Sequence, residues 1–251
     1  MMRCMTQDLF RQDAYQTECT ATVVAISDQG LVLNQTVFYP LGGGQAGDAG
    51  IFRLADGREL LIADTRKEKD EQGQPTANIV HLPAPDQEAW LNELAVGAQV
   101  TAQIDWARRH RLMRFHTATH LLCHLVPMPV NGCSITPDYA RLDFHMTEPL
   151  DKEALTAGIA DLVAAALPVA LGSVTDAELA ANPALVKSMS VSPPRSSGAV
   201  RTVRIGNADQ IDLQPCGGTH VANTAEIGSM VVTKIEKKSA NTRRVVLGFS
   251  A

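Results

Sequence analysis

The 251-residue sequence contains no long hydrophobic run. No stretch approaches the roughly 18 apolar residues that a membrane-spanning helix needs, which argues against a membrane protein of that kind. Residues 1–10 also lack the apolar segment of a secretory signal, so we expect a cytoplasmic protein. Hydrophobic residues make up 45% of the chain and charged residues 20%, a balance typical of globular rather than disordered proteins.

Cysteine is also scarce. The five cysteines are Cys4, Cys19, Cys123, Cys133 and Cys216. Their odd number and irregular spacing argue against the disulfide framework of a small secreted protein. Reduced thiols in a cytosolic protein are the better interpretation.

The chain has no excess of positive charge. Its net charge of −5 argues against indiscriminate binding of nucleic acid through the whole surface. The charge is uneven, however, because residues 1–104 contain 14 acidic and 7 basic residues, whereas residues 105–251 contain 13 acidic and 15 basic ones. The resulting net charges of −7 and +2 indicate that a polyanion would favour the C-terminal part.

The first part of the sequence has the pattern of short strands separated by turns. Ala55–Arg58 is a turn sequence between two apolar runs and predicts a hairpin. Several short strands in succession predict a small β-barrel. The candidate strands cover residues 19–26, 31–37, 51–54, 59–62 and 79–82.

The pattern changes after residue 104. Residues 108–126 contain neither glycine nor proline and end before Pro127, which predicts a long helix. Its apolar face has the spacing of three and four residues that a helix requires, through Leu112, Phe115, Thr119, Leu122 and Val126. We therefore expect an N-terminal domain over residues 1–104 and a second domain over residues 105–251.

The second part mixes helices and strands. Residues 153–167 are rich in alanine and predict a helix with one apolar stripe. The predicted strands cover residues 140–144, 200–205, 230–236 and 243–249. The expected fold class is α+β, with a small β-barrel followed by an α+β domain.

Two short motifs offer the ligands of a metal ion. His116 and His120 are four residues apart on the predicted helix, so their imidazoles lie on one face. The second motif runs from Cys216 to His220, and its two glycines allow a sharp turn that brings the thiol and the imidazole together. Three imidazoles and one thiolate suit tetrahedral zinc, with ligand distances of ~2.0–2.3 Å.

Each motif alone is weak evidence for a metal site, because two histidines on one helix are more often ordinary helical residues than ligands. Their joint presence favours a zinc site. His124, four residues after His120, is a weaker competitor, and we interpret it as structural. A zinc peptidase is disfavoured, because the position after the first histidine is Thr117 rather than the glutamate that acts as its general base.

The motifs resemble those of the AlaX alanyl-tRNA editing proteins and of the editing domain of alanyl-tRNA synthetase. The similar segments follow one another in order over most of the chain and are Tyr39–Gln45, His116–Leu122, Arg141–Phe144, Pro215–Val221, Glu226–Gly228 and Asn241–Arg244. The resemblance implies the longer form of the family, in which a β-barrel precedes the editing domain.

The resemblance implies an ATP-independent hydrolysis of the ester that links a wrong amino acid to alanine tRNA. Serine, and sometimes glycine, is the wrong amino acid, because a pocket built for alanine cannot reject them strongly enough by binding alone. The zinc ligands, for one ion per chain, would be His116, His120, Cys216 and His220. Zinc could activate water or orient the substrate, although four protein ligands leave no open position.

The same resemblance implies further site residues. Thr119 would lie near the substrate, although a helical threonine often bonds its own backbone instead. Asn131 falls approximately where synthetase editing domains carry a polar active-site residue. Gly42, Gly43, Gly44 and Gln45 would line the pocket and separate serine from alanine, whereas from the sequence alone they are a tight loop that lacks the lysine of a phosphate-binding loop.

Basic residues near both motifs are candidates for phosphate contacts with the tRNA acceptor stem. Runs of charge are more often solvated faces, but here RNA has to approach the site. The candidate tRNA-binding residues are Arg108, Arg111, Lys237, Lys238, Arg243 and Arg244.

We therefore predict a cytoplasmic trans-editing hydrolase for Ser-tRNA(Ala) and, as a second substrate, Gly-tRNA(Ala), with neither DNA nor a membrane as partner. Two alternatives stay open. One is a non-catalytic tRNA-binding module with a structural zinc, and the other is a metal-dependent hydrolase of another ester or amide. Substrate turnover distinguishes the first, and dependence on RNA distinguishes the second.

Overall fold

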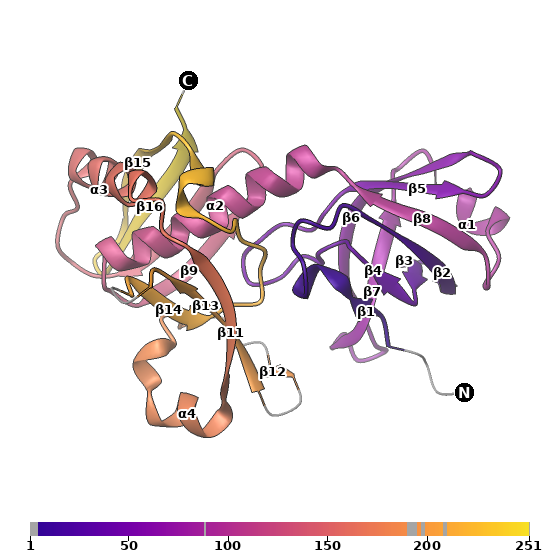
Figure 1. Cartoon of the computed structure of the whole chain (residues 1–251), viewed down its shortest axis with the longest axis horizontal. Helices are drawn as coiled ribbons and strands as arrows, with labels where there is room; N and C mark the ends of the chain where they lie inside the picture. Colours follow the sequence, from indigo (N-terminus) through magenta and orange to yellow (C-terminus); the bar gives the residue numbers. More distant parts are fainter. Residues whose placement is uncertain (1–4, 88, 190–194, 197–198, 208–209, 251) are drawn as a thin grey trace. The chain divides into compact units, whose positions relative to one another are not determined.

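The computed structural model describes residues 5–87, 89–189, 195–196, 199–207 and 210–250. The chain divides into two compact units. The first consists of residues up to Gly42 together with Ala46–Arg109, and the second of Gly43–Gln45 together with His110–Ala251. Helices and antiparallel strands occur together, as the predicted mixed fold requires (Figure 1). That residues 1–104 and 105–251 are separate domains stays a prediction.

The first unit is built mainly of strands, most of them joined by short connections. Its alternating pattern of buried and exposed residues along β6 and β8 follows the two-residue period of a strand with one inward face. Its elements are β1 (Gln7–Asp8), η1 (Leu9–Arg11), β2 (Glu18–Ser27), β3 (Gly30–Leu33), β4 (Gln35–Thr36), β5 (Gly50–Leu54), β6 (Glu59–Lys69), β7 (Pro75–Pro83), α1 (Trp90–Glu93) and β8 (Gln99–Ile104).

Six of these strands form a closed ring. They hydrogen-bond in the order β2-β3-β7-β6-β5-β8, and β8 pairs with β2 to complete the ring. The predicted hairpin is confirmed, since Arg53 on β5 pairs with Glu59 on β6 across the turn. Strand β6 is longer than the predicted strand over residues 59–62, because it continues to Lys69.

A hydrophobic cluster fills the first unit and surrounds one buried histidine. The rings of Phe38 and Phe52 lie 5.2 and 5.0 Å from the ring of His81, which is fully buried. The Leu31 carbonyl oxygen lies 3.1 Å from Nδ1 of His81 and can only accept, so Nδ1 carries the proton. Thr36 then donates its hydroxyl proton to Nε2 at 2.8 Å. Burial lowers the pKa of His81 from 6.5 to about 4.

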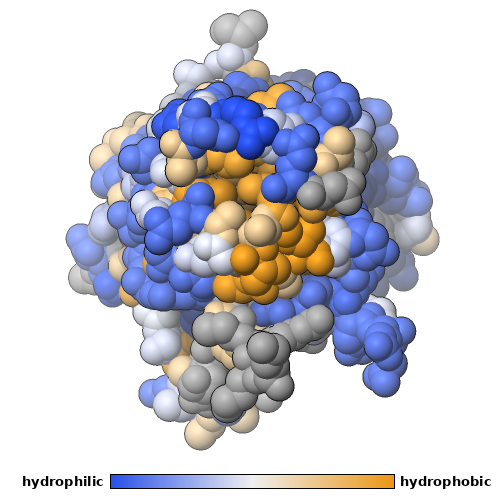
Figure 2. Space-filling view, turned by 90° about the vertical axis from the view of Figure 1, so that its right-hand side faces the viewer, coloured by the Kyte–Doolittle hydropathy of each residue, from blue (hydrophilic) through white to orange (hydrophobic). Residues whose placement is uncertain are grey.

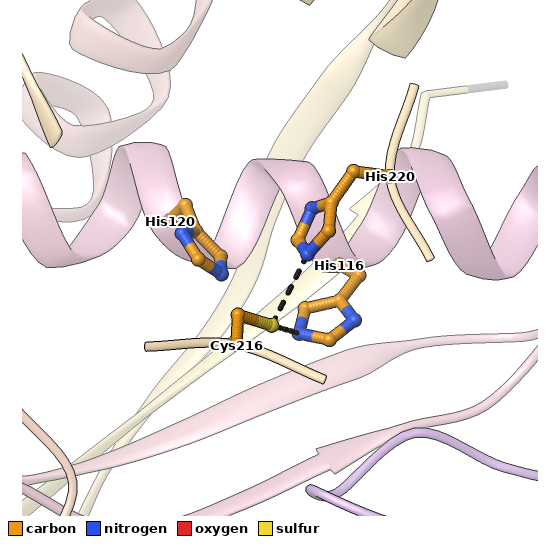
Figure 3. A group of neighbouring side chains, drawn as sticks. All are labelled: His116, His120, Cys216 and His220. Atoms are coloured by element: carbon orange, nitrogen blue, oxygen red, sulfur yellow. Dashed lines mark hydrogen bonds between the residues drawn. The ribbon is translucent and has the colours of Figure 1, made fainter. Parts of the chain in front are cut away.

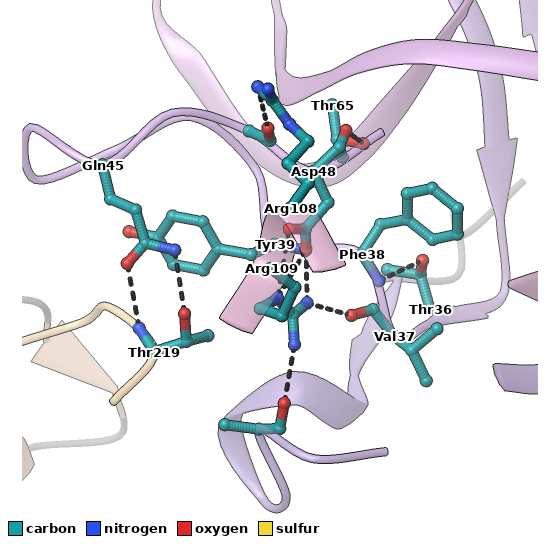
Figure 4. Close-up of polar contacts among 12 residues, drawn as sticks. Thr36, Val37, Phe38, Tyr39, Gln45, Asp48, Thr65, Arg108, Arg109 and Thr219 are labelled. Carbon is teal, nitrogen blue, oxygen red and sulfur yellow. Dashed lines mark hydrogen bonds and ion pairs between the residues drawn. The ribbon is translucent and has the colours of Figure 1, made fainter. Parts of the chain in front are cut away.

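A buried ion pair holds the first turn of the long helix α2 (Trp106–Leu125) within this unit (Figure 4). Arg109 and Asp48 are both fully buried, and Nε of Arg109 lies 2.9 Å from one carboxylate oxygen of Asp48. Arg109 also donates to the carbonyl oxygens of Ala14 and Val37, and the Tyr39 backbone N–H donates to Asp48. Each buried charge is therefore compensated, which a stable fold requires.

The second unit contains two antiparallel sheets and the remainder of α2. The first sheet has the order β15-β16-β10-β9, and in the second β13 pairs with β11, β12 and β14. Its elements are β9 (Val130–Ile135), β10 (Ala140–His145), α3 (Lys152–Ala164), β11 (Val169–Thr175), α4 (Asp176–Ala181), η2 (Pro183–Leu185), β12 (Arg195–Ser196), β13 (Ala199–Ile205), β14 (Asp212–Pro215), η3 (Thr224–Ile227), β15 (Met230–Ser239) and β16 (Thr242–Phe249).

The predicted apolar face of α2 is confirmed, since all five of its residues are buried. The helix is buried on more than that face, however, because His116, Thr117, His120 and their neighbours are covered as well. A single apolar stripe in the sequence predicts an amphipathic helix whose opposite, polar face is exposed to water. Here the polar stripe is enclosed by other segments of the chain instead of facing water.

Some boundaries differ from the prediction. Helix α3 ends at Ala164 rather than at residue 167, and Ala166 has a φ of 49°, outside the helical region. The final hairpin is tighter than expected, because β15 continues to Ser239 and only two residues separate it from β16. Strands β9, β11 and β14 were not anticipated, because their sequences contain glycine, proline or polar residues in place of an apolar alternation.

Hydrophobic side chains gather on the face drawn in Figure 2, and hydrophilic ones border them. The large hydrophobic side chains exposed in the first unit are Met5, Leu41, Leu61 and Val96. Exposed apolar residues are common on globular proteins and do not by themselves mark a functional surface. None of the helices in the described ranges combines the length and apolar character needed to cross a membrane.

The buried His81 predicts a pH dependence of stability in the first unit. Its folded pKa of about 4 lies below the value of 6.5 for an exposed imidazole, so between these pH values only the unfolded chain binds the proton. Stability from this residue is therefore complete above pH 6.5 and is lost as the pH falls towards 4. The loss between pH 7 and pH 5 should be about 2 kcal/mol.

The measurement is urea unfolding followed by tryptophan fluorescence, which reports on this unit because Trp90 and Trp106 both belong to it. The control is His81→Asn, whose amide N–H keeps a donor for the Leu31 carbonyl but does not titrate. The difference between pH 7 and pH 5 should be about 2 kcal/mol smaller in the variant. Equal differences in both proteins would contradict the assignment.

Candidate functional site

The two histidine motifs converge on one point in the second unit (Figure 3). His116 and His120 project from the same face of α2, and Cys216 and His220 come from the loop that follows β14. One ligand atom from each of the four residues lies within 4.8 Å of the others. The Cys216 sulfur is 3.4 Å from Nε2 of His116 and 3.2 Å from Nε2 of His220.

Each imidazole has a partner on the nitrogen that faces away from the cluster. This arrangement satisfies Nδ1 and leaves Nε2 for a ligand, as is usual for histidines that bind metals. The partners are the Gln45 amide oxygen, 2.7 Å from His116, the Asp212 carboxylate, 2.8 Å from His120, and the Thr117 hydroxyl, 3.1 Å from His220.

The loop of the second motif needs glycine at position 218. A Cβ atom placed there would lie 2.1 Å from Cε1 of His116 and 2.8 Å from Oε1 of Gln45. No side chain fits at such distances without displacing the imidazole. The glycine therefore lets the loop approach α2 closely enough for the Cys216 sulfur to reach the histidines.

Three cysteines line the same cavity, but only one is suited to binding a cation. Burial would raise the pKa of the Cys216 thiol, yet the adjacent imidazoles of His116 and His220 lower it well below its usual value. Burial raises the pKa of Cys123 and Cys133 to about 12 each. Because a thiolate rather than a thiol binds a metal, Cys216 is the one of the three that could serve as a ligand.

The histidines of the cluster differ in charge preference. Burial opposes a charge on His120, but its hydrogen bond to Asp212 and its contact with Cys216 raise its pKa to about 9. Burial and the nearby His116 lower the pKa of His220 to about 3. Burial likewise opposes the charge on Asp212, yet His120 and Lys187 lower its pKa to about 2.

Three imidazole nitrogens and one sulfur face a common point, and this donor set fits a metal ion. The donor set and the buried surroundings are those of a four-coordinate site. The group could therefore hold a metal ion. His124 is not part of it, because its exposed ring bonds through Nδ1 to the Ile211 carbonyl oxygen at 2.8 Å.

A cavity of about 110 Å³ opens beside the cluster. Its wall is mainly apolar, with Lys187 as a cationic side chain, 25% exposed, whose Nζ lies 2.5 Å from Asp212. The lining residues are Gly43, His116, Thr119, His120, Cys123, Val130, Cys133, Leu142, Val186, Lys187, Ser188, Gln214, Pro215, Cys216, Gly217 and Gly218.

The two predicted catalytic residues occupy different places. Thr119 lines the cavity, and its hydroxyl donates to the His116 carbonyl oxygen at 2.6 Å, which is the backbone bond of a helical threonine. Asn131 is absent from the cavity lining and bonds Thr242 at 3.4 Å. The structure therefore brings Thr119, but not Asn131, to the cavity, and catalysis by either stays a prediction.

The predicted glycine-rich segment is divided. Gly43 lines the cavity, whereas Gln45 lies fully buried behind His116. Gly44 has a φ of +87°, and a Cβ there would lie 2.9 Å from the Cys133 sulfur. Gly42 belongs to the first unit, where its carbonyl oxygen accepts from the Tyr39 hydroxyl. Substrate binding by this segment stays a prediction.

The predicted tRNA-binding residues differ in solvent exposure and in the groups that their side chains contact. Lys237 and Lys238 are exposed on β15, and so is Arg111 on α2. Arg243 is 8% exposed and bonds loop carbonyls, while Arg244 forms two hydrogen bonds of 2.7 and 2.8 Å with Asp143. Arg108 belongs to the first unit and donates to the Gly47 carbonyl.

Arg111 and a residue that was not among the predicted contacts, Arg114, share one aromatic ring. Their guanidinium carbons lie 4.6 and 4.1 Å from the centre of the Phe249 ring. Each Nε donates to a backbone carbonyl, of Pro137 and of Ile227 respectively. Each guanidinium group is thus held in place by one backbone carbonyl and by the Phe249 ring.

Sequence reasoning did not find the residues that support the ligands. Asp212 and Lys187 lie outside both motifs, and Asp212 lies 92 residues from its histidine. Thr117 lies within the first motif, but its sequence position does not reveal that it supports His220. Gln45 was found only as part of a glycine-rich segment. The one usable signal was the rule that a metal-binding histidine needs a partner on its second nitrogen, but the sequence does not say which residue supplies it.

Two family models match the chain. The model of the threonyl and alanyl tRNA synthetase second additional domain matches residues 200–246, which include the second motif. The model of class II (A) tRNA synthetases matches residues 6–108. The two matches cover different parts of the chain.

The chain is also similar to curated proteins. It is 34% identical over 249 residues to the alanyl-tRNA editing protein AlaX-M of Methanosarcina barkeri, over 96% of this chain and 98% of that protein. It is 31% identical over 245 residues to AlaX-M of Saccharolobus solfataricus, with the same coverage. It is 33% identical to an alanine–tRNA ligase of Sulfurisphaera tokodaii, over 92% of this chain but 25% of the ligase. The chain belongs to the AlaX-M family of alanyl-tRNA editing proteins.

Proposed function

We propose that this protein is a trans-editing hydrolase that removes serine from Ser-tRNA(Ala), with Gly-tRNA(Ala) as a second substrate. The observation that carries the proposal is the group of His116, His120, Cys216 and His220 beside a small cavity. The printed names of the two AlaX-M relatives, alanyl-tRNA editing proteins, support the same reaction. A cytoplasmic location, where charged tRNA is used, is part of the proposal.

Zinc is the proposed ion, one per chain, because three imidazoles and a thiolate are the ligand types that it favours. When bound, it would polarise the ester or orient the amino group of the substrate. The surrounding residues do the rest. Gln45, Asp212 and Thr117 hold the imidazoles in orientation, and the apolar wall of the cavity limits access of bulk water.

The proposed reaction is attack by water on the aminoacyl ester. A water oxygen bonds to the carbonyl carbon, and the bond from that carbon to the ribose oxygen breaks. The ribose oxygen takes up a proton, so the products are serine and tRNA with its terminal hydroxyl restored. Thr119 donates its own proton to the His116 carbonyl, which leaves its oxygen to accept from the serine hydroxyl or the attacking water.

Two further assignments belong to the proposal. The closed ring of six strands corresponds to the β-barrel domain over residues 1–104, and residues 105–251 form the main part of the editing domain. The size of the cavity suits a small aminoacyl group rather than a nucleotide, so the tRNA itself would lie outside it. Exposed Arg111, Lys237 and Lys238 would contact its phosphates.

One observation favours a second candidate function. The four protein ligands fill a tetrahedral site, which is the pattern of a structural zinc. A non-catalytic tRNA-binding module with such a site would bind tRNA(Ala) without releasing the amino acid. Turnover separates the two functions.

We expect the purified protein to bind one zinc ion per chain and to lose it on substitution of the thiolate. Cys216→Ala removes one of four ligands and should weaken zinc binding by more than about 100-fold. The measurement is competition with a chromophoric chelator. Cys133→Ala is the matched control, since Cys133 lines the same cavity but its pKa is raised to about 12, and it should bind zinc like the wild type. Equal loss in both variants would contradict the assignment of the ligand.

We expect serine to be released from Ser-tRNA(Ala) but not from Ser-tRNA(Ser), and alanine to remain on Ala-tRNA(Ala). Deacylation of radiolabelled substrates measures this directly. Cys216→Ala should reduce the rate to that of buffer, and Cys133→Ala should not. Binding of tRNA(Ala) by zinc-loaded protein without release of any amino acid would favour the non-catalytic module instead.

Arg111→Gln should weaken tRNA binding and flatten its salt dependence. The loss of one phosphate contact should reduce the slope of log affinity against log salt by about one. Fluorescence titration at several salt concentrations gives that slope. Arg53→Gln changes the net charge equally at an exposed ion pair of the first unit and is the control. An unchanged slope for Arg111→Gln would exclude this contact.

A further inference from the structure

Gln45 is joined to both metal-ligand motifs by hydrogen bonds, and Figure 4 shows its two bonds to Thr219. Its amide oxygen lies 2.7 Å from Nδ1 of His116 and accepts from the Thr219 backbone N–H at 3.1 Å. Its amide nitrogen donates to the Thr219 hydroxyl at 2.8 Å. The side chain is fully buried. One amide thus bonds a ligand on α2 and the residue next to a ligand on the distant loop.

The orientation of this amide is fixed by its neighbours. The backbone N–H of Thr219 can only donate, so the atom facing it is the oxygen of Gln45. That same oxygen faces Nδ1 of His116, and two acceptors cannot bond each other. Nδ1 therefore carries the proton, and the lone pair of His116 is on Nε2, 3.4 Å from the Cys216 sulfur.

The segment that carries Gln45 is itself held firmly. The Ile135 backbone N–H donates to the Gly44 carbonyl at 2.7 Å, and Gln45 forms a parallel bridge with Ile135 at the end of β9. Gly44 fits against Cys133 only because it has no side chain and adopts a φ of +87°. The segment Gly43–Gln45 therefore belongs to the second unit although its neighbours in sequence belong to the first.

Gln45 differs from the other two partners in chemistry and in origin. Asp212 and Thr117 lie within the continuous part of the second unit, close in sequence to other ligands or on the same helix. Gln45, by contrast, lies in the first fifth of the sequence, far from all four ligands. It is also neutral, so unlike Asp212 it orients an imidazole without adding a charge to the site.

We propose that Gln45 is a positioning residue of the metal site, whose amide oxygen fixes His116 as the Nδ1–H tautomer and directs Nε2 to the ion. Without the segment Gly43–Gln45, the imidazole of His116 would lack the partner that orients it towards the ion. This inference rests on the metal-binding part of the proposed function. It gives Gln45 a role on the far side of His116 from the ion, in place of contact with substrate.

Two substitutions at this position separate orientation from packing. Gln45→Met keeps the length of the side chain but removes both polar atoms, and it should weaken zinc binding about 10- to 100-fold. Gln45→Glu keeps an oxygen that accepts from Nδ1 of His116 and from the Thr219 N–H, and the Thr219 hydroxyl can donate to its second oxygen. It should bind zinc within about threefold of the wild type. Chelator competition on the full chain measures both.

Thr219→Val is the control for the loop. It removes the bond from the Gln45 amide nitrogen to the Thr219 hydroxyl but keeps the bond from the amide oxygen to His116. Its zinc affinity should stay close to that of the wild type. A loss as large as that of Gln45→Met would show that the loop depends on packing around Gln45, and it would overturn the proposal.

A second measurement does not depend on affinity. Long-range ¹H–¹⁵N NMR of the zinc-loaded wild type should show His116 protonated on Nδ1, with Nε2 shifted by the metal. In Gln45→Met the Nδ1 proton of His116 should exchange faster with solvent, and in Gln45→Glu it should stay protected. An unchanged Nδ1 proton and unchanged affinity in Gln45→Met would overturn the proposal.

The outcomes also separate this inference from the proposed function. If the wild type binds no zinc, the metal-binding part of the proposed function fails and the role of Gln45 fails with it. If the wild type and Gln45→Met bind zinc equally and the wild type releases serine from Ser-tRNA(Ala), the proposed function stands and only the positioning role fails.

Discussion

A neutral imidazole has one N–H and one lone pair, and three buried imidazoles share a space in which the ligand atoms lie within 4.8 Å of one another. Each ring can direct its lone pair inward only if its N–H is bonded outward. The amide of Gln45, the carboxylate of Asp212 and the hydroxyl of Thr117 meet this requirement from three different segments. The same arrangement brings the loop so close to α2 that a Cβ atom at Gly218 would lie 2.1 Å from the His116 ring.

Helix α2 contributes both to the buried ion pair of the first unit and to the metal-ligand group of the second. Its first turn is fixed by the buried pair of Arg109 and Asp48 in the first unit, and its later turns carry His116 and His120 in the second. Because a buried pair that loses one partner leaves an uncompensated charge, the start of the helix has little freedom. The spacing of four residues then places both imidazoles on one face, so the register of the ligands is set by the helix itself.

The sequence predicted the parts that depend on local pattern. The period of α2, the hairpin between β5 and β6 and the two ligand motifs each lie within a short window. The supporting residues could not be predicted in this way, because Asp212 and Gln45 become partners only through pairing of distant segments. Arg243 and Arg244 show the same limit, since their charge suggests RNA contact but their guanidinium groups bond the Ser239 carbonyl and Asp143.

The position of Gln45 also bears on the order in which the site can be assembled during synthesis. Its partner Thr219 follows 174 residues later in the chain. At ribosomal rates of about 5–20 residues per second, Thr219 is synthesised on the order of ten seconds or more after Gln45. The first unit can be complete by then, because its ring closes with β8 at Ile104. The metal site can therefore form only after the first unit has been synthesised, and a truncated chain that ends before residue 216 would hold the closed ring of strands without Cys216 and His220.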